Sequence, residues 1–90
     1  MPIEERRSWA AVGARLIKLR QSVGMSQSEF IGAMTMGPIA YDQIENGQRD
    51  VTIAFAQEIQ RHYSVPAAWV LEGDTSAMTT AWMDRLGLDS

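Results

Sequence analysis

The apolar residues near the start of the chain recur at helical spacing. They stand three or four residues apart, at the period that places side chains on one face of an α-helix. The members of this stripe are Trp9, Val12, Leu16, Leu19 and Val23. The basic residues Arg15 and Lys18 fall on the opposite face, and Gly24 stands where a left-handed C-terminal cap is expected. The pattern predicts an amphipathic helix over residues 8–23.

Two short helices are predicted next from their capping residues. Ser26 and Glu29 form a capping box, in which the serine hydroxyl accepts from the Glu29 amide and Glu29 reaches back. This box predicts a helix that starts at residue 26 and ends near Thr35. Pro38 predicts the start of the next helix, because a proline in the first helical position loses no hydrogen bond; Gly47 would end it. The inward positions are Phe30, Ile31, Met34, Tyr41 and Ile44. Two short helices joined by a tight turn are typical of a helix-turn-helix unit.

Three further helices complete the prediction, and no strand pattern is present. Thr52 caps a helix whose buried side carries Phe55, Ala56, Ile59 and Tyr63. Pro66 begins a one-turn helix that Gly73 stops, and a weaker helix follows over about residues 76–86. With 90 residues, the chain fits one small all-α domain.

Composition and candidate chemistry exclude several classes of protein. The chain has no cysteine and a single histidine, His62, so we expect no disulfide, no metal site and no cofactor. No apolar run approaches the roughly 20 residues of a membrane helix, and the N-terminus has no apolar leader. We therefore expect a soluble cytoplasmic protein. The carboxylates of Asp42, Glu45 and Asp50 could suggest acid–base catalysis. No nucleophile, oxyanion donor or glycine-rich phosphate loop accompanies them in the sequence, so we do not expect an enzyme.

Charge is distributed unevenly along the chain. Residues 1–24 carry five basic and two acidic side chains, a net charge of +3, whereas residues 25–90 carry three basic and nine acidic ones, a net charge of −6. A nucleic-acid binder usually has a basic surface, and here only the first segment and Arg49 supply one. The commoner explanation of the N-terminal charges is a solvated helix face.

A set of residues carries a resemblance to a known family, in order and without gaps between about residues 12 and 73. They are Leu16, Leu19, Arg20, Gly24, Ser26, Gln27, Ile44, Glu45, Asn46, Gly47, Ser64, Val65, Trp69, Leu71 and Gly73. The sequence resembles the Cro/C1-type (XRE) helix-turn-helix family, which includes the repressors of lambdoid phages. The resemblance implies an all-α bundle of five helices over residues 8–73 that binds operator DNA, usually as a two-fold dimer. An arm at residues 1–7 and a helical extension at residues 74–90, with an extra C-terminal helix, would flank it.

The resemblance also implies roles for residues around the predicted helix-turn-helix unit. Ser26 and Gln27, at the start of the second helix, would meet a DNA phosphate, where free helical amides favour an anion. Asn46 would donate to another phosphate, with Gln48 and Arg49 on the same rim.

An internal ion pair between Arg20 and Glu45 is also implied. Arg20 lies at the edge of the buried stripe, which agrees with this role, and Glu45 pointing at DNA would be repelled. The alternative is an exposed pair that contributes little to stability.

The third helix would read bases in the major groove. The residues expected to face DNA there are Gly37, Pro38, Ile39, Ala40 and Gln43. The family usually has polar residues at the first exposed positions, whereas this chain has proline, isoleucine and alanine. Gln43 can make a bidentate contact to adenine, and Ile39 or Ala40 can pack on a thymine methyl group.

Two functions are compatible with these residues. The favoured interpretation is a sequence-specific DNA-binding regulator, a repressor that binds a palindromic operator on double-stranded DNA as a homodimer. The alternative is a helix-turn-helix fold used as a protein–protein interaction module. No small-molecule ligand or membrane partner is indicated.

The apolar residues of the C-terminal third allow two interpretations. They are Trp69, Val70, Met78, Trp82 and Leu86. They either form a dimer contact or pack back on their own domain. The tryptophan rings at helical spacing are expected to pack in the core rather than to stack on bases.

Overall fold

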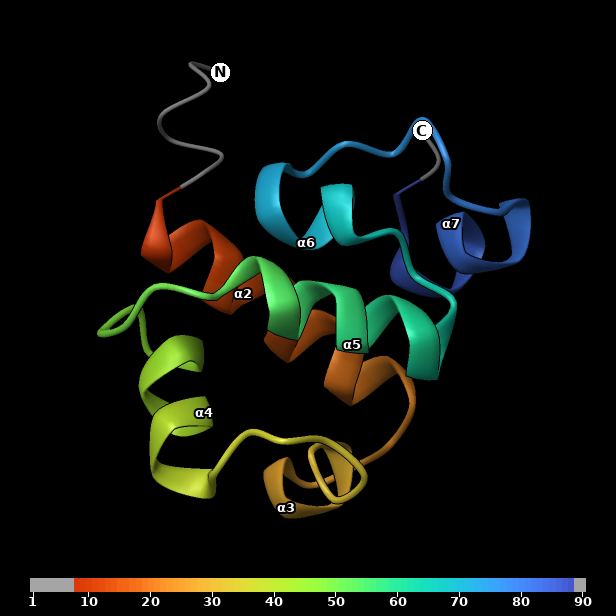
Figure 1. Ribbon diagram of the computed structural model, residues 1–90. Helices are drawn as coiled ribbons and strands as arrows, with labels where there is room; N and C mark the ends of the chain where they lie inside the picture. Colours follow the sequence, from red (N-terminus) through yellow and green to blue (C-terminus); the bar gives the residue numbers. More distant parts are fainter. Residues whose placement is uncertain (1–7, 89–90) are drawn as a thin grey trace.

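The computed structural model describes residues 8–88, and within that range it contains six helices and no strand. The helices are α2 (Trp9–Ser22), α3 (Gln27–Phe30), α4 (Pro38–Glu45), α5 (Ile53–Tyr63), α6 (Ala67–Glu72) and α7 (Thr80–Leu86). In Figure 1, α5 lies in front of α2, with α3 and α4 below these two helices and α6 and α7 above them. The predicted all-α helix-turn-helix bundle is confirmed.

The core lies where the apolar stripes of these helices meet. Its largest fully buried side chains come from every helix: Trp69, Tyr41, Phe30, Phe55, Leu16, Leu19, Ile44, Ile59, Leu86, Val65 and Val70. The predicted caps hold the helix ends, since the Thr52 hydroxyl accepts from the Phe55 amide at 3.0 Å and Gly73 ends α6 at a φ of 73°. Side-chain caps of this kind satisfy amides that have no partner within the helix.

The second helix is shorter than its sequence predicts. It ends at Phe30, not near Thr35, and the chain continues in turns in which the Met34 amide donates to the Ile31 carbonyl at 2.9 Å. Glycine at position 32 weakens a helix there. The Thr35 amide and hydroxyl donate to the Glu58 carboxylate of α5 at 3.0–3.2 Å. This long-range contact gives the turn hydrogen bonds that a longer helix would have supplied.

Two further predictions about helices were wrong. Trp9, assigned to the inward stripe of the first helix, is 49% exposed in the first turn of α2. The last helix begins at Thr80 rather than near residue 76, because the Ser76 amide donates to the Asp74 side chain at 2.9 Å in a local turn. Met78 therefore precedes the helix that carries Trp82.

The backbones of α2 and α4 meet at Gly13, which the sequence analysis did not single out. A Cβ atom at this position would lie 2.5 Å from the carbonyl oxygens of both Ile44 and Glu45. Gly47 lies close to the first turn of α2, although less tightly, since a Cβ there would stand 3.2 Å from the Ala10 Cα. Small residues at the crossing allow the close approach that fixes the place of α4.

The C-terminal apolar residues pack against the same core. Trp69, Val70 and Leu86 are 2%, 0% and 1% exposed, and the half-buried Met78 and Trp82 pack on the edge of the cluster. The guanidinium of Arg85 lies 5.3 Å from the Trp82 ring centroid. This placement favours packing on the same domain, and only the half-buried Met78 and Trp82 keep surface that a second protein could contact.

Across residues 8–88, the helices are too short or too polar for any of them to traverse a lipid bilayer.

Candidate nucleic-acid interface

The outer face of α4 is exposed over most of its N-terminal half. Tyr41, Ile44 and Glu45 point inward and are buried, whereas Pro38, Ile39 and Asp42 are exposed. Ile39 is 76% exposed, the largest fraction among the exposed large apolar residues described. Because proline fills the first helical position, the chain enters α4 with a fixed φ. The helix therefore presents an apolar N-terminal half to solvent.

An ion pair between α2 and the end of α4 holds this helix from behind. Arg20 Nε donates to Glu45 Oε2 at 2.7 Å and Arg20 Nη2 to Glu45 Oε1 at 3.1 Å, while Nη1 donates to the Met25 carbonyl at 3.0 Å. The Glu45 side chain is 3% exposed and that of Arg20 17% exposed, so the pair lies well inside the domain. Burial acts to raise the pKa of Glu45, but hydrogen bonds from Arg20 and Gln27 outweigh it and hold that pKa below its ordinary value.

Gln27 connects the start of α3 to α4. Its Nε2 donates to Glu45 Oε1 and to Asp42 Oδ1, both at 3.0 Å. The Ser26 hydroxyl accepts from the Glu29 amide at 3.2 Å, and the Ser26 amide donates to Glu29 Oε1 at 2.8 Å. The predicted capping box is thus present, and the two amide protons of Gln27 are already engaged within the protein.

Two side-chain contacts shape the segment that follows α4. Asn46 Nδ2 donates to the Asp42 carbonyl at 2.9 Å. The side chain is exposed, and its second amide proton can donate to another acceptor. Arg49 Nε donates to Gln43 Oε1 at 2.9 Å and draws the loop back toward the helix. Gln48 is exposed beside them.

A protein-family model with the description helix-turn-helix matches residues 16–70. The chain belongs to the Cro/C1-type (XRE) helix-turn-helix family. Comparison with curated proteins and with solved structures gives no match. Domains of this helix-turn-helix family are DNA-binding transcription regulators, and their partner is double-stranded DNA. The matched segment runs from α2 into α6 and includes the α3–α4 unit described above.

The electrostatic balance of this helix-turn-helix surface is acidic. Glu29, Asp42 and Asp50 are exposed there, and Arg49 is the one basic residue in the stretch 26–50. Backbone and hydroxyl hydrogen bonds from Ser26 lower the pKa of Glu29, so its carboxylate stays charged at neutral pH. Attraction for phosphate on this face therefore depends on a single guanidinium and on neutral donors.

The structure adds three features of the helix-turn-helix domain that the sequence analysis missed. These are the backbone contact at Gly13, the bond between Thr35 and Glu58, and the bond between Gln43 and Arg49. Only the first had a usable signal, since a glycine within a strongly periodic helix indicates close packing.

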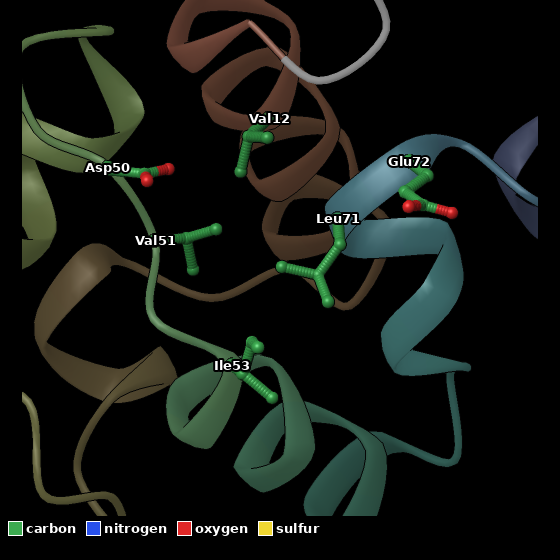
Figure 2. Close-up of a pocket in the computed structure, with 6 residues that line it drawn as sticks. All are labelled: Val12, Asp50, Val51, Ile53, Leu71 and Glu72. Atoms are coloured by element: carbon green, nitrogen blue, oxygen red, sulfur yellow. The ribbon is translucent and has the colours of Figure 1, made fainter. Parts of the chain in front are cut away.

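A shallow depression of about 270 Å³ lies to the side of α4, between α2, the loop before α5 and the end of α6. Figure 2 shows the apolar side chains of Val12, Val51, Ile53 and Leu71 around it. The carboxylates of Asp50 and Glu72 complete its lining. Within residues 8–88, no group of three acidic or histidine side chains is placed to hold a metal ion.

Proposed function

We propose that the protein is a sequence-specific DNA-binding repressor whose α4 enters the major groove. The observation that carries this proposal is the way α4 is mounted. Its inner face is fixed by the backbone contact at Gly13 and by the buried pair of Arg20 and Glu45. No element within residues 8–88 covers its outer face, and Ile39 is 76% exposed on it. A rigid helix with one free face suits insertion into a groove.

The outer face assigns a chemistry to each part of the contact. Ile39 and the half-buried Ala40 would pack on thymine methyl groups. Gly37 and Pro38, at the start of α4, would face the DNA next to them. The second amide proton of Asn46 is available to a phosphate. Gln27 would have to exchange one of its internal hydrogen bonds to reach a phosphate, so we assign it mainly to holding α3 against α4.

A two-fold dimer is part of the proposal. One α4 covers only a half-site, and two copies placed about one DNA turn apart would read a palindrome. Occupancy of such a site excludes other proteins from the same DNA, which is the basis for proposing repression. We propose the cytoplasm as the place where a protein with this role acts.

A protein-interaction module is the second candidate, favoured by one observation. The α3–α4 surface combines an exposed isoleucine with three exposed carboxylates and a single basic residue. Phosphates are repelled by such a surface, whereas a partner protein with an apolar and basic patch is not. The same residue, Ile39, would be central to either contact.

Selection of bound duplexes from a random DNA pool tests the proposal directly. We expect a palindromic winner that stays bound at modest salt, with a salt slope set by the few counterions that the single guanidinium of each protomer can release. Asn46→Ala should weaken all sequences alike, whereas changes at Ile39 should alter the preferred bases. Failure to enrich any sequence, together with binding that disappears at modest salt, would favour the interaction module.

A further inference from the structure

We propose that Arg49 reads a guanine base and that Gln43 positions it. This inference deepens the proposed DNA-binding function and rests on it. It changes the expectations from the sequence, in which Arg49 lies on the phosphate rim and Gln43 reads adenine. The observation behind it is the hydrogen bond of 2.9 Å from Arg49 Nε to Gln43 Oε1.

The bond places the guanidinium beside the exposed face of α4. Gln43 is half-buried one helical turn after Ile39, so the two side chains lie on the same face of the helix. Arg49 is exposed in the loop and folds back onto that turn. The three residues therefore form a row that continues past the C-terminal end of α4.

The atoms left over after this bond match guanine. Only Nε of Arg49 is used by Gln43, so the Nη1 and Nη2 groups remain as two parallel donors. Guanine presents two neighbouring acceptors in the major groove, O6 and N7, and arginine pairs with both at once. A phosphate also accepts from such a fork, but it does not require the fork to be held beside the base-reading row.

The same bond weakens the case for adenine readout by Gln43. A bidentate contact to adenine needs the side-chain carbonyl as an acceptor and the amide as a donor. The carbonyl oxygen already accepts from Arg49, and turning it toward a base would release the arginine. Holding the long arginine side chain before DNA arrives also reduces the conformational entropy lost on binding.

The experiment measures base preference and salt dependence separately for a set of variants. Arg49→Met removes the charge and the donors, Arg49→Lys keeps the charge and loses the planar fork, and Gln43→Met keeps the side-chain length and loses the acceptor. Arg61→Lys, at an exposed position on α5, is the control. We expect a guanine preferred at one position of each half-site by about 5- to 150-fold over the other bases. Arg49→Met should abolish that preference, and Arg49→Lys should reduce it with an unchanged salt slope, because a lysine can still donate to guanine. Gln43→Met should reduce the preference, and Arg61→Lys should behave like the parent.

The outcomes separate this inference from the proposed function. If the parent protein enriches an operator and Arg49→Met keeps the same base preference at every position, Arg49 is not a base reader and the inference is wrong. A uniform loss of affinity at all sequences with a shallower salt slope in Arg49→Met, and no change in preference, would also overturn it in favour of phosphate anchoring. If the parent enriches no sequence at all, the proposed function fails first.

Discussion

Replacement of Gly13 by alanine tests how closely α2 and α4 are packed. In an exposed helix interior, this change is stabilising by about 1 kcal/mol, because alanine has the higher helix propensity. Here the new Cβ would lie 2.5 Å from two carbonyl oxygens, roughly 1 Å inside ordinary contact. Overpacking of this kind costs about 1–3 kcal/mol. The upper end applies, since the opposing atoms are backbone and cannot rotate away.

The net expectation is a loss of about 2 kcal/mol in the free energy of unfolding, the opposite sign from helix propensity alone. For a domain of this size, this corresponds to a fall of about 8–16 °C in Tm. Thermal and urea unfolding followed by circular dichroism measure it. Gly32→Ala is the matched control, because its Cβ would stand 3.4 Å from its nearest neighbours and no positive φ opposes it. A Tm for Gly13→Ala at or above that of the parent would refute the close backbone contact.

Two further predictions concern the buried ion pair and the C-terminal helix. The lowered pKa of Glu45 means that its contribution to stability is complete above the ordinary value of 4.5 and is lost as pH falls through the folded-state pKa. Glu45→Gln should therefore flatten the acid limb of stability measured by urea unfolding, and an unchanged limb would contradict the role of the pair. Trp82→Asp should lower the mass seen by sedimentation if α7 contributes to the proposed dimer. An unchanged mass with a reduced Tm would assign Trp82 to packing on its own domain alone.

The order and type of the helices follow from local chemistry, and so they were predictable. Ser26, Thr52 and Gly73 act on amides and carbonyls a few residues away, which makes their effect visible in the sequence. The end of α3 depends instead on a contact between Thr35 and Glu58, which are 23 residues apart. No short-range pattern reports such a contact.

The candidate interface shows the same division. The family motif identifies Gln27 and Arg49 as residues near DNA, because their positions follow from the fold. Which of their protons are free depends on side-chain bonds to Asp42, Glu45 and Gln43. Sequence spacing determines where a residue lies in the fold. Which of its hydrogen-bond donors remain available depends on neighbouring side chains from other segments.

The two hydrogen bonds from Gln27 to α4 have a consequence for engineering a new DNA specificity. Transplanting the exposed residues of another recognition helix onto α4 would replace Asp42 and remove one acceptor of the Gln27 amide. The stranded donor would then compete for the Glu45 carboxylate that Arg20 already uses, and the angle between α3 and α4 would lose one of its side-chain cross-links. Positions 27 and 42 should therefore be exchanged together. They act as a pair that supports the fold, not as residues that select the bases.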